Sequence, residues 1–599
     1  MRKLNNRQNK IFLLKNKLTL RKTAPLFPKS QRPVIKKYNP VSGKNQPLTP
    51  LTGSKFYRTI ALLFFLITLI RITNKPILAQ DNDVKPVGLH RFDIKTIDFN
   101  GRIEDIALVD FNQDNLLDCL LTYTEKNLTS TPDRIGTGRS AGILFQKPTG
   151  FAEKFDQTWP APTETVGLLP GDFSETPGVE IGCLDGHGLN CLALQPVRLT
   201  PVSNQPSFNL TLEKICEMPS ILNYPPADSL PVLPYAVDLD NNGLTDVIVP
   251  QDNGYQIYFQ SLKDSRRAFI SCLIPLSALG GLKKNNLSFL TITRTLPNFK
   301  VIDLNGDGLK DLVIFQNETF FYYLQTPVSL TGSEDISKRF AGQPNGLFAL
   351  KFLQTEIGQN ELNAAEVIFT DIDRNGLPDL VISSIRGKLE DFTALTTRII
   401  IWLATTPAGN GSPVYPDTPI QIINLKGICP LLRLADVNGD GDLDLITSSF
   451  RTDIKANLRK AVLHYVDLNY QVYFFRKNNG LFSKIADYDR KMNFPMDLAG
   501  RGQKYFSHVY LQYDFDNDGR TDLLRVSGPD KKRGILTINK GHPKERLINQ
   551  DDISFEKDEY LLYPTRIPQQ VLVEDLNRDG KKDIIMVYRS RIIILTSKP

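Results

Sequence analysis

The sequence lacks the short motifs that mark many catalytic centres. It contains only five histidines, six cysteines and two tryptophans in 599 residues. No Cys-x-x-Cys pair supports a zinc or thioredoxin-type site, and no His-Glu-x-x-His, Walker A or Gly-x-Gly-x-x-Gly sequence occurs. One Gly-x-Ser-x-Gly match surrounds Ser140, but the strand-like 143-ILFQ-146 follows it where a nucleophile elbow needs a helix. We therefore expect no catalytic site, and so few tryptophans also disfavour a sugar platform built from indole rings.

The six cysteines are scattered, and one pair raises the question of a disulfide. Cys183 and Cys191 flank a predicted turn centred on His187, so a hairpin would place them opposite each other. An oxidising export compartment would permit a disulfide between them. Buried free thiols in two strands are the alternative.

Acidic residues are absent from the first 80 positions, which hold 17 Lys and Arg residues. Because the whole chain has a formal net charge of +7, residues 81–599 carry about −10 (7 − 17). An acidic body is a poor partner for nucleic acid. Residues 1–58 are basic, rich in Asn and Pro and without sustained periodicity, so we expect them to be disordered.

The apolar run that follows is short. The stretch 59-TIALLFFLITLI-70 has 12 residues, whereas a membrane-spanning helix needs roughly 20. With its basic flank and the small Ala79 before Gln80, it resembles a secretory signal, and an uncleaved N-terminal anchor is the alternative. Residues 1–80 are therefore predicted to be a leader and 81–599 an exported body that is secreted, periplasmic or at the cell surface. Membrane contact is expected only through such an anchor.

An acidic nine-residue motif recurs through this body. The copies are 110-DFNQDNLLD-118, 238-DLDNNGLTD-246, 303-DLNGDGLKD-311, 371-DIDRNGLPD-379, 436-DVNGDGDLD-444, 514-DFDNDGRTD-522 and 575-DLNRDGKKD-583, with a divergent eighth copy, 172-DFSETPGVE-180. Successive copies start 61 to 78 residues apart. Self-similarity at a nearly fixed spacing indicates a repeat architecture.

Each motif lies between two short apolar runs, as in 367-VIFT-370 before it and 380-LVIS-383 after it. This pattern predicts a β-hairpin whose loop is the motif, and further apolar runs give about four strands per repeat. We therefore predict an all-β fold, a β-propeller with eight four-stranded blades, seven being the alternative. Only 16 residues follow the last motif, and 88-GLHRFDIKTIDF-99 precedes the first blade, so this N-terminal strand is expected to complete the last blade and close the ring.

The motif has the composition of a cation site. At positions 1, 3, 5 and 9, at least three of the four residues are carboxylates in each of the seven good copies. Oxygen-only ligands with several carboxylates suit a hard ion, and flexible loop geometry favours Ca²⁺ over Mg²⁺. Glycine at position 6, or Asn115 in the first copy, permits the positive φ that lets a short loop curl around an ion. The expected ligands are Asp110, Asn112, Asp114 and Asp118; Asp238, Asp240, Asn242 and Asp246; Asp303, Asn305, Asp307 and Asp311; Asp371, Asp373, Asn375 and Asp379; Asp436, Asn438, Asp440 and Asp444; Asp514, Asp516, Asp518 and Asp522; and Asp575, Asn577, Asp579 and Asp583.

The residues exclude two related interpretations: a metal site in the divergent copy, and EF-hand loops. The divergent copy keeps only Asp172 and Glu180 of the four ligand positions and has Pro177 at position 6, so no metal is expected there and up to seven sites remain. An EF-hand needs a Glu at position 12, where these motifs have residues such as Ile314 or Thr447 inside predicted strands.

The seven good motifs resemble the calcium loops of the FG-GAP/VCBS repeat family, found in integrin α-subunit propellers and many exported bacterial proteins. The resemblance covers about residues 88–599. It implies propeller blades with calcium between their first two strands and a non-catalytic role in cell adhesion or in binding a protein or glycan at a propeller face. The alternative is an exported propeller enzyme, such as a polysaccharide lyase or glycosidase, with its site at the central channel.

Overall fold

The computed structural model describes residues 85–598, except for 126–137, 176–177, 193–211, 223–228, 264–265, 277–278, 285–289, 296–297, 317–318, 327–338, 350–364, 388–394, 406–412, 451–464, 496–508, 529–533, 544–552 and 556–558. The chain divides into Met1–Asn82 and Asp83–Pro599. The predicted leader, with the apolar run 59–70, lies outside the described residues, as does the Pro177 turn. None of the helices in the described part is long and apolar enough to cross a membrane.

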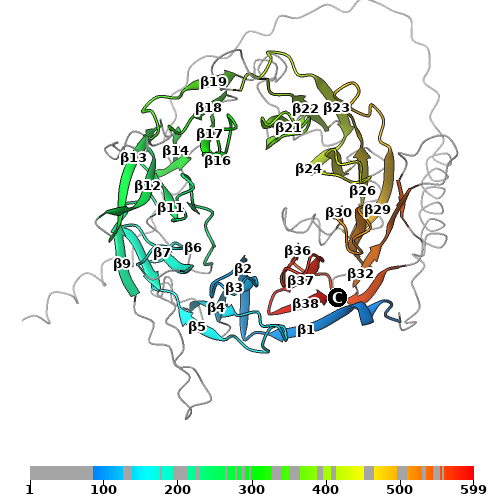
Figure 1. Cartoon of the computed structure of the whole chain (residues 1–599), viewed down its shortest axis with the longest axis horizontal. Coiled ribbons are helices and arrows are strands. Elements are labelled where there is room, and N and C mark those ends of the chain that lie inside the picture. Colours follow the sequence, from blue (N-terminus) through cyan, green and yellow to red (C-terminus); the bar gives the residue numbers. More distant parts are fainter. Residues whose placement is uncertain are drawn as a thin grey trace, which may run out of the picture. The chain divides into compact units, whose positions relative to one another are not determined.

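The body is a ring of eight four-stranded antiparallel sheets (Figure 1). The first four blades are blade 1, β2 (Gly101–Val109), β3 (Asp118–Glu125), β4 (Arg139–Leu144) and β5 (Gln157–Pro160); blade 2, β6 (Gly167–Gly171), β7 (Glu180–Leu184), β8 (Gly188–Leu192) and β9 (Leu212–Glu217); blade 3, β10 (Ala236–Val237), β11 (Asp246–Gln251), β12 (Gly254–Lys263) and β13 (Arg266–Pro275); and blade 4, β16 (Asn298–Ile302), β17 (Asp311–Gln316), β18 (Thr319–Tyr323) and β19 (Gly346–Ala349).

The other four complete the circle. They are blade 5, β20 (Ala365–Thr370), β21 (Asp379–Arg386), β22 (Thr396–Trp402) and β23 (Gln421–Lys426); blade 6, β24 (Ile428–Ala435), β25 (Asp444–Phe450), β26 (Tyr465–Tyr473) and β29 (Tyr488–Pro495); blade 7, β30 (Val509–Tyr513), β31 (Asp522–Ser527), β32 (Gly534–Asn539) and β35 (Leu561–Thr565); and blade 8, β36 (Gln570–Glu574), β37 (Asp583–Tyr588), β38 (Arg591–Ser597) and β1 (Phe92–Asp98). The eight-blade prediction is confirmed, and the seven-blade alternative is wrong.

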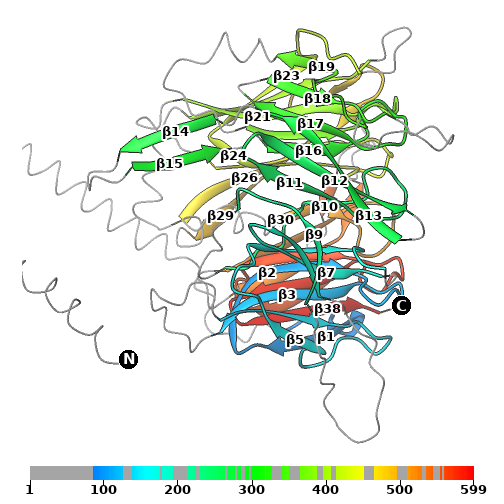
Figure 2. The same ribbon diagram turned by 90° about the vertical axis from the view of Figure 1, so that its left-hand side faces the viewer.

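Three small hairpins and one helical turn add to the blades. The hairpins are β14 (Leu279–Lys284) with β15 (Leu290–Thr295), β27 (Phe475–Arg476) with β28 (Leu481–Phe482), and β33 (Gly541–Pro543) with β34 (Ile553–Phe555); the short 3₁₀ helix η1 (Leu89–Arg91) precedes β1. Figure 2 shows β14 and β15 projecting from one side of the ring.

The hydrophobic core is divided among the junctions between blades. The second strands are nearly continuous runs of buried apolar residues, as in Leu312, Val313 and Ile314 of β17. Their two faces pack against different neighbours, because successive side chains of a strand point to opposite faces. Accordingly Val313 belongs to a cluster shared with blade 5, while Leu312 and Ile314 belong to one shared with blade 3.

The N-terminal strand closes the ring, as predicted. β1 pairs antiparallel with β38 over seven residues, from Phe92 opposite Ser597 to Asp98 opposite Arg591. Ile97 is fully buried in a cluster that also contains Ile103 of blade 1 and Ile592 of blade 8. The first and last parts of the body are therefore held by one shared sheet and one shared core.

The possible disulfide between Cys183 and Cys191 is excluded. In the β7–β8 hairpin Cys183 lies opposite Asn190, and Cys191 lies opposite Gly182, so the two thiols are one register step apart. One step moves a side chain to the other face of the sheet. Cys183 is buried against blade 1 and Cys191 against blade 3, and both are free thiols. The strand predicted after Ser140 is β4, which begins at Arg139 and so includes Ser140 itself.

Candidate metal-binding loops

All eight acidic motifs occupy the same place in their blades, the loop between the first and second strands. Position 9 is the first residue of the second strand and is buried in every copy. The side chains of Asp118, Asp246, Asp311, Asp379, Asp444, Asp522 and Asp583 are inaccessible to solvent. The sequence predicted the loop, and the structure places its last carboxylate inside the blade.

The carboxylate at position 9 joins the loop to the rest of its own blade. In blade 4, Asp311 Oδ2 accepts the backbone N–H of Leu304 at 2.9 Å, and its Oδ1 accepts that of Gln325, beyond the third strand, at 2.7 Å. The same two bonds recur in the other six good copies, for example from Val437 and Phe475 to Asp444. This residue is therefore a fixed structural link as well as a candidate ligand.

Position 1 organises the loop from its other end. Asp303 accepts the N–H groups of Gly306 at 2.8 Å and Gly308 at 2.9 Å. Asn305 at position 3 accepts the N–H of Asp307, and Asp307 at position 5 accepts that of Leu309. These short-range bonds are Asx turns, which bend the chain back on itself. The loop thus gathers its oxygen atoms through its own backbone.

Two backbone positions in each good loop are left-handed. Position 6 has positive φ as expected, for example 88° at Gly308. Position 4 is also left-handed, with φ of 60° at Arg374 and 54° at Arg578. The sequence did not reveal this second position, because its residues are Gln113, Asn241, Gly306, Arg374, Gly439, Asn517 and Arg578, which share no side-chain type.

In three loops the carboxylates at positions 1, 3 and 9 converge. Each group offers one oxygen per residue, all within 4.8 Å of one another: Asp238, Asp240 and Asp246; Asp371, Asp373 and Asp379; and Asp514, Asp516 and Asp522. These are the loops with Asp at position 3. Asp518 at position 5 is not a member of its group, and it accepts the N–H of Arg520. An all-oxygen donor set of this kind fits a hard cation such as Ca²⁺.

Two of these three groups have a basic partner within the protein. Arg339 forms an ion pair with Asp240, and the two side chains are only 11% and 3% exposed. Lys540 forms an ion pair with Asp516 in the loop that has four carboxylates. Among the described residues, no Lys or Arg forms an ion pair with Asp373. The cluster around Asp371 is therefore the least neutralised of the three.

In the divergent loop, an arginine from the next blade pairs with the carboxylate at position 1. Arg267 of β13 donates from its two terminal guanidinium nitrogens, Nη1 and Nη2, to the two carboxylate oxygens of Asp172. Glu180 at position 9 accepts the N–H groups of Phe173 and Ser174 and the hydroxyl of Ser174. The charge of Asp172 in this loop is therefore balanced by an arginine from the next blade.

Burial raises the pKa of the position-9 Asp in each of the seven good copies from 3.8. The pKa is about 6 for Asp118, Asp311, Asp379 and Asp583, about 7 for Asp246 and Asp522, and about 8 for Asp444. The two N–H donors lower each pKa, and neighbouring loop carboxylates raise it. A rise of two units opposes ionisation in the folded state by about 3 kcal/mol. A bound cation would offset that cost.

Neighbouring loops contact each other around the ring. Asn241 of blade 3 donates to the carbonyl of Gly308 in blade 4, and Arg520 of blade 7 donates to that of Asn438 in blade 6. Arg578 of blade 8 donates to Asn115 of blade 1 at 2.9 Å, across the point of closure. The conformation of one loop is thus mechanically linked to that of the next.

Comparisons with known proteins add little to this geometry. No protein-family model and no curated protein matches the chain. Among solved structures, the NanB sialidase of Streptococcus pneumoniae matches with 10% identity and a TM-score of 0.25, over 84% of this chain and 70% of the sialidase. A hypothetical selenium-binding protein of Sulfolobus tokodaii matches with 9% identity and a TM-score of 0.25, over 78% and 92%. Similarities this remote carry no argument about activity.

Proposed function

We propose that this chain is an exported, calcium-stabilised propeller of the FG-GAP/VCBS type that acts as a non-catalytic binding or adhesion module for a protein or glycan. The observation that supports calcium is the repetition of one oxygen-rich loop in seven blades. In three of these loops, carboxylates converge to within 4.8 Å. The basic leader with its apolar run supports export.

Calcium would be held at positions 1, 3 and 9, with the position-5 oxygen or water completing the shell. Bound there, the ion supplies positive charge at the buried end of the loop. Exposed extracellular sites of this kind bind at about 10⁻⁴–10⁻³ M, so export and calcium dependence agree. The chain's own residues already fold each loop, and the ion would remove the electrostatic penalty of burying their carboxylates.

The charged side chains on the inner strands support binding over catalysis. Glu366 of β20 accepts the N–H of Leu432 at 3.1 Å, and Arg433 donates to Gln512 at 2.8 Å. Burial raises the pKa of Glu366, while the charges of Arg433 and Lys300 lower it. Each of these two side chains, Glu366 and Arg433, is engaged with a group of the neighbouring blade, which favours a structural role for it over a catalytic one.

Unfolding of the full chain tests the calcium half of the proposal. We expect the unfolding midpoint to rise steeply between excess chelator and 10 mM Ca²⁺, and much less with 10 mM Mg²⁺. An unchanged midpoint would contradict calcium binding. For the binding half, labelled calcium-loaded chain is applied to arrayed glycans and arrayed extracellular proteins, and retention on neither array would contradict a binding module.

A further inference from the structure

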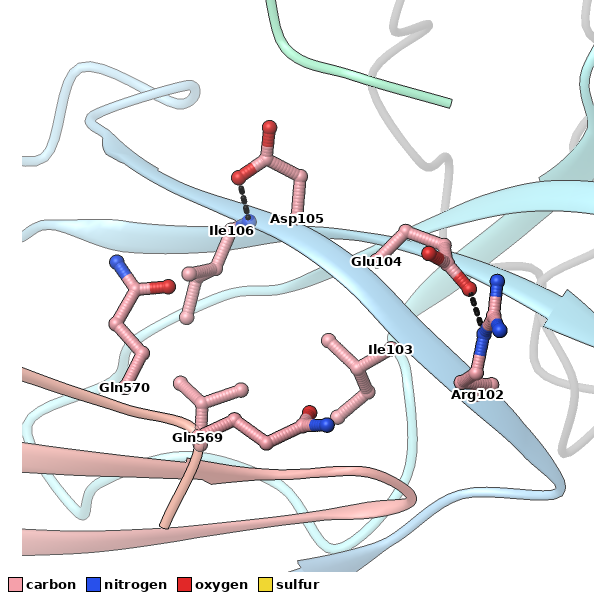
Figure 3. Close-up of a pocket in the computed structure, with 8 residues that line it drawn as sticks. Arg102, Ile103, Glu104, Asp105, Ile106, Gln569 and Gln570 are labelled. Carbon is pink, nitrogen blue, oxygen red and sulfur yellow. Dashed lines mark hydrogen bonds and ion pairs between the residues drawn. The ribbon is translucent and has the colours of Figure 1, made fainter. Parts of the chain in front are cut away.

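A polar cavity lies where the ring closes. It has a volume of about 260 Å³ and is lined by β2 of blade 1 and by Gln569, Gln570 and Val587 of blade 8 (Figure 3). Drug-sized ligands occupy pockets of roughly 300–1,000 Å³. A cavity slightly smaller than that range suits a single small ring rather than an oligomer.

A β-bulge shapes one wall of the cavity. In the β2–β3 ladder Ile103 lies opposite Tyr123 and Asp105 lies opposite Thr122, so Glu104 is an extra residue. Bulges bend a strand and redirect its side chains, and they are frequent beside functional sites. In Figure 3, Asp105 and Glu104 project from β2 in different directions, with Glu104 turned toward Arg102.

At the junction between blades 5 and 6, the residue equivalent to Gln570 bonds to the next blade. In blade 5, Glu366 lies five residues before its motif and accepts the N–H of Leu432, four residues before the motif of blade 6. The equivalent pair at ring closure is Gln570 and Ile106. There the N–H of Ile106 is taken by Asp105 Oδ1 at 3.0 Å, so Gln570 loses its counterpart.

The two glutamine side chains are consequently available to a ligand. Within the described part of the chain, the side-chain amides of Gln569 and Gln570 make no hydrogen bond. Each amide offers two donors and an acceptor. Both project beside the cavity in Figure 3, where Ile103 and Ile106 face them from β2. The backbone N–H of Gln569 bonds to Val587, which fixes the position of this segment.

The ionised side chains around the cavity already have partners within the protein. Glu104 pairs with Arg102 and accepts the hydroxyl of Thr124 at 3.2 Å. Asp105 accepts the N–H groups of Ile106 and, at 3.1 Å, Val232. An anionic ligand therefore finds its nearest cation, Arg102, already paired, and the two carboxylates already accept hydrogen bonds from the protein. A hydroxyl group, which donates and accepts at once, matches the free amides.

We infer that this cavity binds one neutral, hydroxyl-rich ring, such as a terminal sugar residue. The amides of Gln569 and Gln570 form hydrogen bonds with its hydroxyl groups, and the side chains of Ile103, Ile106 and Val587 contact the C–H face of the ring. This inference rests on the proposed binding function and narrows its ligand class to glycans.

Saturation-transfer NMR on the calcium-loaded full chain tests the inference. The probes are the methyl glycosides of glucose, galactose, mannose and N-acetylglucosamine, each at millimolar concentration. We expect at least one to bind wild type, and Gln569→Ala and Gln570→Ala each to weaken that binding at least tenfold. Gln256→Ala, a half-buried glutamine of blade 3, is the matched control and should leave it unchanged.

Two results would overturn the inference. One is that none of the four glycosides binds, and the other is that binding persists undiminished in the double Gln569→Ala, Gln570→Ala variant. Because these side chains make no hydrogen bond to any residue that the structure describes, all variants should retain the wild-type unfolding midpoint in calcium. If wild type still binds an arrayed protein or glycan in either case, the binding proposal stands and only the location or class of the ligand is wrong.

Discussion

The loop of blade 5 offers the sharpest test of calcium binding. Asp371→Ala removes one of three carboxylates whose oxygens lie within 4.8 Å and among which Asp373 has no basic partner in the described residues. A site with a dissociation constant of about 10⁻⁴–10⁻³ M, in 10 mM Ca²⁺, stabilises the folded state by about 1.4–2.7 kcal/mol. The variant should lose that amount of calcium-induced stabilisation and should keep the calcium-induced stabilisation that the other loops contribute.

The assay is urea unfolding of wild type and variant at 25 °C, each in chelator and in 10 mM Ca²⁺. Taking the difference within each protein cancels any direct effect of the substitution on folding. Asp172→Ala is the matched control, since its carboxylate pairs with Arg267 and its loop is expected to hold no ion. The reasoning is refuted if wild type gains nothing from calcium, or if Asp172→Ala loses as much of the gain as Asp371→Ala.

Three further predictions concern the loops and the closure of the ring by β1. Lys540→Met should increase the calcium-induced rise in stability by about 1 kcal/mol, because it removes the cation that competes for Asp516; an unchanged or smaller rise in the same urea assay would contradict this competition. In chelator, stability should be greatest near pH 4 and fall progressively as the pH rises to about 8, because the folded-state pKa values of Asp311, Asp522 and Asp444, about 6, 7 and 8, lie above the ordinary 3.8 and the folded state resists losing these protons. Thermal midpoints across that range test this, and a rise with pH would reverse the sign. Ile97→Ala should cost about 2–5 kcal/mol because Ile97 is fully buried, whereas exposed Thr96→Ala should cost no more than about 0.5 kcal/mol; equal costs in urea unfolding would mean that β1 does not close the ring.

The sequence predicted the architecture well because each blade carries the same local instructions. Two short apolar runs on either side of a turn-forming motif specify a hairpin without reference to distant residues. Eight copies of this pattern specify eight blades. Closure by residues 88–99 was predictable because the last repeat ran out of chain after two strands. These predictions needed only the count and spacing of local elements.

Features that depend on contacts between blades were not predictable. Arg339, Lys540 and Arg267 lie outside the motifs and reach the carboxylates only in the folded ring. The bulge at Glu104 depends on the register of β2 against β3. Cys183 and Cys191 were predicted to lie opposite each other, and the observed register of β7 against β8 differs from that by one residue. A single sequence gives periodicity, but it does not give register to within one residue.

The eight loops face one electrostatic problem, because each buries a carboxylate at the start of its second strand. The divergent loop balances its charge with Arg267 and has lost its other acidic ligands. The loops at Asp240 and Asp516 combine an internal cation with a full set of ligands, and the loop at Asp371 combines three clustered carboxylates with no such partner. If an external ion is the common solution, it should stabilise the folded state most in the loop of Asp371, less in the loops of Asp240 and Asp516, and least in the divergent loop. Because adjacent loops also bond to each other, as Arg578 does to Asn115, an ion bound in one blade would stiffen the junction with the next. Calcium would then act on the ring as a whole, including the closure where the Gln569–Gln570 cavity lies.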